Sequence, residues 1–417
     1  MIGAGPGGAT AGMVCAQAGL RVLILEKASF PRFRIGESLL PRNGSLIEEL
    51  GLGEAMKSVP CVSKLGIEFS MGHELKGTCF PFDLGLLPGA PTYNVERAGF
   101  DAMLIEQAKA RGAEVRERTS VKSIQKLADD DVAVETDDGV IRGRYLLDAS
   151  GQATVVARHL RIRQTYADAI FQKVAYFQHF ENVKRRAGNE EGYPLIVMCE
   201  EGWFWAIPIN DKQTSIGFVA NSGLAKYIGI SADRMLEWAI KRCPAIADRM
   251  SNATGPSTNQ VIADFSYACR PYAGPGYFLI GDAAAFLDPI FSTGVCLSML
   301  TAREAAQAVV AILKGKTSPA STCKRYIRFV DGGTRVYFKL IRQYYQHSFR
   351  ELFLNGQGPM QVHRAVLSIL AGHVFPKPPF ALRWRLRLFD FFVWFNQYRS
   401  IVPPREHFSL LGEGGQS

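Results

Sequence analysis

The chain opens on a run of glycines, and their spacing constrains the fold more than any other feature. The pattern G-x-G-x-x-G is satisfied by Gly3, Gly5 and Gly8. A small-residue run follows over 9–19, and then an apolar segment over 21–26 that ends in Glu26, 18 residues after Gly8. Such glycines permit a tight turn that brings a pyrophosphate against a helix N-terminus, and an acid about 20 residues later can bind a ribose hydroxyl. The opening therefore predicts a Rossmann-like α/β unit that binds a dinucleotide.

The first strand of this unit is short in the sequence. A strand should precede Gly3, but only Met1 and Ile2 do so. Two explanations are open: a truncated first strand, which would weaken cofactor binding, or a natural start that lies upstream.

A second feature is the aromatic segment 202–208, which contains Trp203 and Trp205. Alternate residues of a strand point to the same side, so the two indoles would form one aromatic wall. Apolar runs at 194–198 and 215–220 flank it and favour a sheet. The alternative is a half-buried hairpin with two ordinary core tryptophans, which is the commoner use of aromatic residues.

Two further segments carry polar groups at strand or loop ends. The segment 276–284 reads as a strand and a turn with an acid, Asp282, which can hydrogen-bond a ribityl chain. The run that follows contains Asp288-Pro289 and Ser292-Thr293-Gly294, where backbone amides can form an anion-binding nest. The loop 30–41 is dense in glycine, proline and charge and enters a helix near Pro41.

Composition excludes several classes. The chain has 417 residues, 47% hydrophobic and 21% charged, which is an ordinary globular composition. Its net charge of +9 is local, because residues 319–417 contain 14 Lys+Arg and 5 Asp+Glu. We find no nucleic-acid module, no metal-ligand spacing and no apolar run of the roughly 18 residues that a membrane span needs. Eight scattered cysteines without a Cys-x-x-Cys pair indicate reduced thiols and a cytoplasmic location.

Together these motifs resemble a known family. The glycine fingerprint, Asp148-Ala-Ser-Gly151 and Gly281-Asp282 resemble flavoprotein monooxygenases of the p-hydroxybenzoate hydroxylase type over about residues 1–320. Four more motifs narrow the resemblance to the flavin-dependent halogenases: Trp203-x-Trp205-x-Ile207-Pro208, Pro31-Arg32-Phe33-x-Ile35-Gly36-Glu37-Ser38, Lys64 in Lys-x-Gly-x-x-Phe, and Asp288-Pro-x-x-Ser-Thr-Gly-Val295.

The resemblance implies an α/β fold in three parts. A discontinuous Rossmann-like FAD-binding domain would comprise 1–60, 91–165 and 263–320. An antiparallel β-sheet substrate domain would comprise 61–90 and 166–262, and a helical C-terminal region 321–417. From the residue patterns we expect strands at 114–124, 132–135, 140–144 and 145–148, and helices ending near 111 and covering 232–241 and 301–313.

The resemblance also implies a mechanism. A separate flavin reductase would supply FAD as FADH2, whose C4a-hydroperoxide with oxygen would be attacked by chloride or bromide held at the amides of Thr293 and Gly294. The hypohalous acid would travel to Lys64 and halogenate an electron-rich aromatic, while Trp203 and Trp205 separate the flavin from that substrate. The implied FAD-binding residues are Gly3, Gly5, Gly8, Glu26, Arg32, Ser38, Arg97, Asp282, Pro289 and Gly294.

Two departures bear on the substrate. Tryptophan halogenases have a glutamate immediately before the Ser-Thr-Gly motif, where this chain has Phe291, which favours a phenol or a pyrrole, either free or bound to an acidic carrier protein. Members of that group usually have a histidine where this chain has Cys296.

Several alternatives are open at this point. They are an FAD monooxygenase, a geranylgeranyl-reductase-like flavoprotein and an inactive flavin-binding protein, and any single lysine such as Lys64 is by default a surface residue. The aromatic, cationic segment 379–400 would form a lid over the substrate channel, a carrier-docking face or a peripheral membrane helix, and we favour the lid.

Overall fold

The glycine run forms a turn between Ile2 and helix α1 (Pro6–Gln17). In the computed structural model, which describes residues 1–87, 90–255, 257–355 and 359–412, Ile2 makes parallel bridges to both Leu25 and Asp148. It thereby joins the parallel pair β1 (Leu23–Leu25) and β6 (Glu114–Arg116) to three more strands: β10 (Leu146–Asp148), β19 (Tyr277–Leu279) and β18 (Ala273–Gly274). The short first strand is thus a single bridging residue in the middle of a layer.

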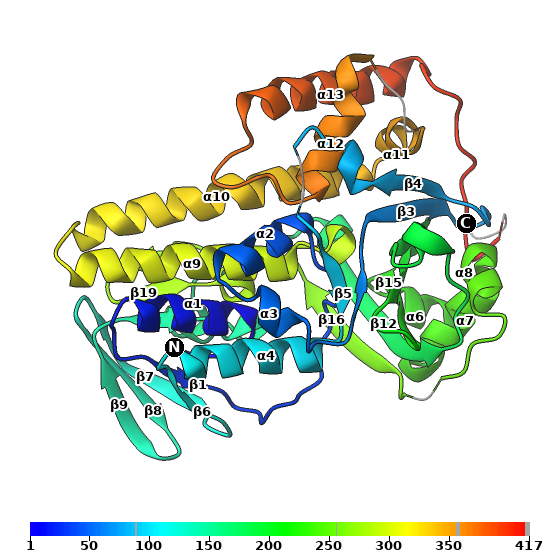
Figure 1. Cartoon of the computed structure of the whole chain (residues 1–417). Coiled ribbons are helices and arrows are strands. Elements are labelled where there is room, and N and C mark those ends of the chain that lie inside the picture. Colours follow the sequence, from blue (N-terminus) through cyan, green and yellow to red (C-terminus); the bar gives the residue numbers. More distant parts are fainter. Residues whose placement is uncertain (88–89, 256, 356–358, 413–417) are drawn as a thin grey trace.

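Helices α1, α4 (Arg97–Ala110) and α9 (Gly294–Leu313) lie side by side on this layer, and α10 (Pro319–Tyr344) lies along α9 (Figure 1). Gly7 allows α1 to approach α9 closely, because a Cβ at that position would lie 2.5 Å from Ser298 Oγ. Among the described residues, α9 is the one helix long and apolar enough to cross a membrane. Most of α9 is buried between α1 and α10, which is the position of a core helix.

A seven-stranded sheet forms the second layer. Its strands are, in order, β16 (Gln260–Phe265), β12 (Gln172–Glu181), β15 (Gln213–Asn221), β14 (Gly202–Pro208), β13 (Leu195–Cys199), β3 (Gly66–Met71) and β4 (Thr78–Pro81). All neighbours are antiparallel except β13 and β3, which are parallel. The predicted antiparallel sheet is therefore correct apart from this pair, whose strands are far apart in sequence and are not joined by a hairpin.

Strand alternation gives the sheet two buried faces. Phe204 and Phe218 point to one face, where their rings stack at 4.5 Å and α7 (Met235–Arg242) and α8 (Pro244–Arg249) cover them. Trp203 and Trp205 point to the other face. That face packs against the C-terminal helices α11 (His347–Leu354), α12 (Val362–Leu370) and α13 (Phe380–Tyr398) and the end of α10.

The remaining elements are peripheral or short. They are α2 (Pro41–Glu49), α3 (Gly53–Met56), β2 (Cys61–Ser63), β5 (Tyr93–Val95), β7 (Val121–Ala128), β8 (Asp131–Thr136), β9 (Gly139–Gly143), α5 (Val155–His159), β11 (Arg163–Thr165), α6 (Leu224–Ile228), β17 (Tyr267–Cys269) and β20 (Ala285–Phe286).

The predicted α/β class with its helical C-terminal part is confirmed, but two predicted elements have wrong bounds. The strand expected over 114–124 is two strands, β6 and β7, because the chain between them passes through Arg118 with φ of 53°. The helix expected over 301–313 begins seven residues earlier, at Gly294. The domain boundaries remain a prediction.

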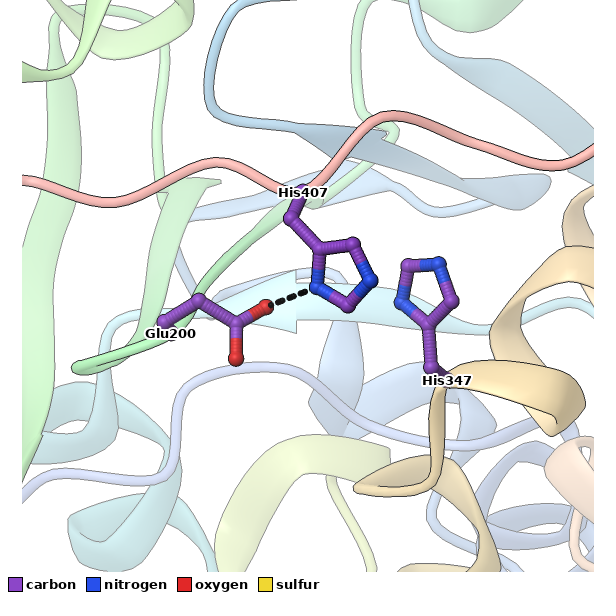
Figure 2. Close-up of side chains that lie close together, drawn as sticks. All are labelled: Glu200, His347 and His407. Atoms are coloured by element: carbon purple, nitrogen blue, oxygen red, sulfur yellow. Dashed lines mark hydrogen bonds and ion pairs between the residues drawn. The ribbon is translucent and has the colours of Figure 1, made fainter. Parts of the chain in front are cut away.

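The C-terminal tail after α13 returns along the second layer and is held by an ion-pair cluster (Figure 2). His407 from the tail stacks on His347 at 3.7 Å between ring centres, and its Nδ1 lies 3.1 Å from Oε1 of Glu200. The guanidinium of Arg350 lies 3.4 Å from Nδ1 of His347 and 3.7 Å from Glu200. Because a cation of the protein already lies against these potential ligands, we assign the cluster an anchoring role and no metal.

The packing of Trp205 against Gly217 generates a stability prediction. These residues are direct cross-strand partners, and a Cβ at position 217 would lie 2.2 Å from the indole. We expect Gly217→Ala to lower the free energy of unfolding by about 1–3 kcal/mol through overpacking and to change the near-ultraviolet circular dichroism. In the control Gly143→Ala, the added Cβ makes an ordinary 3.6 Å contact with Val132. Equal stability of the two variants in urea would contradict the packing described here.

Candidate functional site

A cavity of about 730 Å³ lies where the two layers meet. Most of the residues that the sequence singled out line it: Gly3, Gly5, Glu26, Arg32, Ser38, Arg97, Trp203, Trp205, Asp282, Pro289 and Gly294. Three others, Gly8, Lys64 and Thr293, do not. The cavity size is within the range of sites that hold cofactors and small ligands.

One end of the cavity fits a dinucleotide. Helix α1 begins there after Gly5 and has no side-chain cap, so its first amides can bind a phosphate. Gly8 shapes the turn rather than the wall, because a Cβ there would lie 1.9 Å from the carbonyl oxygen of Gly3. The buried Glu26 carboxylate accepts hydrogen bonds from the amides of Ala4 (2.9 Å) and Ala28 (3.0 Å), which fix its direction. The turn, the uncapped helix and the oriented acid fit the groups of an adenine dinucleotide.

Residues 30–39 are here called the strap, and residues 32–38 of it form another wall of the cavity. Asp101, which is fully buried, accepts hydrogen bonds from Arg32 (3.0 Å) and from two nitrogens of Arg97 (2.9 and 3.0 Å). Arg97 also donates to the carbonyl oxygen of Ile35 at 2.6 Å and so holds the strap. Asp101 was not among the predicted site residues, although its position four residues after Arg97 on a helix is the spacing of an ion pair.

The two tryptophans form one wall, as strand alternation predicts. Their ring centres are 5.8 Å apart, and Nε1 of Trp205 donates to Ser215 Oγ at 3.0 Å. Phe177 from the neighbouring part of the sheet continues the wall at 5.8 Å from Trp205. The wall is therefore continuous, apolar and fixed in orientation.

The N-terminus of α9 reaches the cavity at Gly294. Thr293 is the N-cap and makes no side-chain cap, and a Cβ at Gly294 would meet nothing within 4 Å. The open space and the uncapped amides suit a small anion. Cys296 does not reach the cavity lining; it is buried, and burial raises the pKa of its thiol to about 12, so it is neither acid nor base near pH 7.

Lys64 lies between β2 and β3 and is 1% exposed, so it is not the surface lysine that is the default expectation. Its Nζ donates to the carbonyl oxygen of Leu39 at 2.8 Å and lies 5.3 Å from the centre of the Phe82 ring. Burial lowers the pKa of Lys64 to about 7. A large fraction of this amine is therefore neutral, and nucleophilic, near physiological pH.

Asp288, a buried group at the cavity wall, has partners that the sequence did not predict. Asp288 accepts a hydrogen bond from Tyr345 Oη at 2.7 Å, and burial raises the pKa of Asp288. The Lys173 ammonium lies 4.3 Å from the centre of the Tyr345 ring. The motif suggested Asp288 as part of a loop, but its partners lie on β12 and just after α10, and no local pattern links them.

Helix α13 contributes no residue to the lining of this cavity. Its inner face packs on α11 and α12, and its outer face exposes Phe391, Trp394 and Tyr398. The helix that we favour as a lid thus carries exposed aromatic side chains, and its lid function remains a prediction.

Comparison with known proteins agrees with this geometry. A family model described as an FAD binding domain matches residues 1–326. A 1H-pyrrole-2-carbonyl peptidyl-carrier protein brominase of Pseudoalteromonas luteoviolacea is 33% identical over 83% of this chain and 84% of its own length. A tryptophan 2-halogenase of Chondromyces crocatus is 31% identical over 84% of this chain and 68% of its own. The solved structure of the flavin-dependent brominase Bmp2 superposes with a TM-score of 0.80 and 31% identity, over 93% of this chain and 98% of the other.

The burial of Lys64 gives a pH-dependent stability. Because the amine holds its proton less tightly in the folded chain than in the unfolded one, unfolding takes up protons between about pH 7 and the ordinary lysine pKa of 10.5, and stability rises with pH across that window. Below it the wild type carries a buried charge. We expect Lys64→Met to stabilise the protein at pH 6, on the order of a few kcal/mol, and much less at pH 9.

Urea unfolding at the two pH values measures this difference. The exposed Lys226 supplies the control, Lys226→Met, whose effect should not change in the same way. A Lys64→Met effect that is equal at pH 6 and pH 9 would show that the amine is not desolvated.

Proposed function

Since the chain belongs to the flavin-dependent halogenases, we propose that it uses FADH2, oxygen and a halide to halogenate an electron-rich aromatic through Lys64. The observation that carries the proposal is the position of the buried Lys64 amine. The amine donates a hydrogen bond to the carbonyl oxygen of Leu39, and the preceding residue, Ser38, lines the cavity. A reactive amine is therefore held by the chain segment that forms the cavity wall.

The residues of the cavity have separate parts in this reaction. When bound, FADH2 supplies the electrons with which oxygen and halide become hypohalous acid. Gly3, Gly5, Gly8 and Glu26 would bind its adenine dinucleotide portion, and Arg32, Ser38, Arg97, Asp282 and Pro289 would line the rest. The halide would bind at the amides of Thr293 and Gly294, whose donors leave an anion's remaining surface open.

Trp203 and Trp205 keep two substrates apart. Their indoles pack side by side with ring centres 5.8 Å apart, and Trp205 is fixed by its hydrogen bond to Ser215, so the bulk of both rings stands in the way of an organic molecule. A small neutral oxidant needs less room than an aromatic ring and would leave by way of the strap. Exclusion by bulk thus directs the oxidant to Lys64 instead of letting the flavin react with the aromatic.

At Lys64 the neutral amine accepts the halogen. The nitrogen lone pair attacks the halogen of hypohalous acid, the N–halogen bond forms, the O–halogen bond breaks, and the amine proton leaves with the oxygen as water. The lowered pKa of Lys64 supports this step, because only the unprotonated amine is nucleophilic.

We propose a phenol or a pyrrole as the aromatic, the pyrrole bound to a carrier protein. Phe291 packs against Tyr344 at 5.3 Å and brings no carboxylate toward the site, which suits a ring that is already activated. The Pseudoalteromonas relative is named for a carrier-bound pyrrole, and the cationic residues 319–417 favour an acidic carrier. A separate flavin reductase would supply FADH2.

The central experiment needs no organic substrate. Enzyme-bound FAD is first reduced under anaerobic conditions. The reduced enzyme is then mixed with oxygen at increasing chloride or bromide concentrations, and the flavin absorbance is followed by stopped flow. We expect one phase of reoxidation to accelerate with halide. Reoxidation rates that do not change with halide concentration, together with release of hydrogen peroxide, would rule out the proposed halogenation. Adding a pyrrolyl carrier protein, free pyrrole-2-carboxylate, a phenol or tryptophan then identifies the acceptor.

Removing the amine separates the two halves of the reaction. Lys64→Ala should lower product halogenation at least about 100-fold, as expected for loss of a nucleophile, while flavin oxidation continues at the wild-type rate. Lys64→Arg, which keeps a cation without a neutral amine, should be equally inactive. Halogenated product from Lys64→Ala at wild-type yield would exclude the lysine from the reaction, and Lys226→Ala controls for loss of a charge.

A further inference from the structure

The chain beside Lys64 forms a small patch of three extended segments. In β2 and β5, Ser63 pairs with Tyr93, and the ladder continues where the Lys64 amide donates to the carbonyl oxygen of Thr92 at 2.8 Å. On the other side of β5, Ser38 of the strap pairs with Asn94. Strand β5 therefore lies between β2 and the strap.

This register places four polar side chains on one face. Residues directly opposite each other in an antiparallel ladder share a face, as do residues two apart in one strand. Lys64 is thus on the same face as Thr92, Thr92 on the same face as Asn94, and Asn94 on the same face as Ser38. The Lys64 side chain must cross this face, because its Nζ reaches Leu39 on the strap.

Three of these side chains carry buried oxygens with no hydrogen-bond partner among the described residues: Ser38 Oγ, Thr92 Oγ1 and Asn94 Oδ1. The three residues are 4%, 2% and 0% exposed. Leaving one buried polar atom unpaired is costly, and three on one face beside an amine are a strong indication of a bound polar molecule.

The face also reaches the cavity. Ser38 lines the cavity wall, Asn94 is its cross-strand partner, and Thr92 with Lys64 is the next pair on this face. The side-chain nitrogen Nδ2 of Asn94 donates to the carbonyl oxygen of Gly192 at 2.8 Å, so the side-chain oxygen Oδ1 points away from Gly192. The polar face therefore runs from the cavity to the lysine.

We propose that Ser38, Thr92 and Asn94 bind hypohalous acid beside Lys64 and orient it for attack by the amine. This inference rests on the proposed function, which supplies the oxidant. Hypohalous acid has one O–H donor and an oxygen acceptor, so Asn94 Oδ1 can accept from it while the hydroxyls donate to it. The halogen is then left to face the amine, and the N–halogen bond forms as the O–halogen bond breaks, with water as the leaving molecule. The three are positioning residues and undergo no chemistry.

Thr92 offers the sharpest test, because Thr92→Val removes a hydroxyl with little change of shape and Thr92→Ser restores it. In the reconstituted enzyme we expect Thr92→Val to lower halogenated product per flavin oxidised about three- to tenfold, the loss expected for one uncharged hydrogen bond. The missing oxidant should appear as halogenation of a cyclic 1,3-diketone added as a trap. Thr92→Ser should recover at least half of the wild-type coupling, and Ser38→Ala should resemble Thr92→Val.

Matched controls come from two other buried hydroxyls that have no hydrogen-bond partner in the described part of the chain. Thr10 in α1 and Ser70 in β3 have equally buried, unpaired oxygens but lie outside this patch. Thr10→Val and Ser70→Ala should leave the coupling within about twofold of the wild type. Coupling equal in Thr92→Val and Thr10→Val would overturn the inference.

A second readout uses flavin-free protein. Potassium cyanate provides isocyanic acid, a small neutral electrophile that carbamylates unprotonated amines, and peptide mass spectrometry measures modification at Lys64 against exposed Lys226. We expect Thr92→Val and Ser38→Ala to slow modification of Lys64 several-fold and the controls not to do so. A Lys64 that stays unmodified in the wild type would overturn the inference.

The two readouts also separate this inference from the proposed function. If the wild type makes no hypohalous acid, the proposed function fails, and with it the ligand named here. If the wild type halogenates and the Thr92 and Thr10 variants behave alike in both assays, only the role of the polar face is overturned.

Discussion

The buried carboxylate of Asp101 is the interaction on which the arrangement around the cavity depends. Charges removed from water must be paired, and here one carboxylate pairs with two guanidinium groups. Arg97 uses its remaining nitrogen to hold the strap by a backbone oxygen, and the strap in turn pairs with β5 and accepts the hydrogen bond of Lys64. The position of the amine is thus set, through the strap, by an ion pair on α4.

The seven-stranded sheet separates the cavity on one of its faces from a second apolar core on the other. The odd-numbered residues Trp203 and Trp205 face the cavity and the C-terminal helices, and Phe204 between them faces α7 and α8. Both faces are apolar, so hydrophobicity alone does not determine which face a side chain joins. The alternation of side chains along the strand determines it. A shift of one residue in β14 would exchange the wall for the opposite core.

Features set by neighbouring residues were predictable from the sequence. The glycine turn, the acid Glu26 and the shared face of the two tryptophans depend on local spacing, and the structure places them as expected in the cavity wall. The family resemblance was confirmed, because ordered motifs carry it.

Features set by pairing between distant segments were not predictable. Asp288 meets Tyr345, and Ser38 meets Asn94, across 57 and 56 residues, and no period in the sequence records such contacts. The start of α9 was missed for a similar reason: Gly294 is a poor helix former, and close packing on α1 makes the first turns helical. Local preference sets turns and periods, whereas tertiary packing sets boundaries and partners.

The strap borders the cavity at Ser38 and accepts the hydrogen bond of Lys64 at Leu39, so two adjacent residues serve the cavity and the lysine. For protein engineering, this adjacency means that the cavity and the surroundings of Lys64 cannot be altered independently through the strap. A library of strap variants selected to bind an altered cofactor would also move the carbonyl oxygen that accepts the hydrogen bond of Lys64. Each change in cofactor binding would therefore be accompanied by a change in the position of the amine. Phe82, whose ring centre lies 5.3 Å from the amine, does not line the cavity, so diversity there would change the surroundings of Lys64 and leave the cavity lining in place.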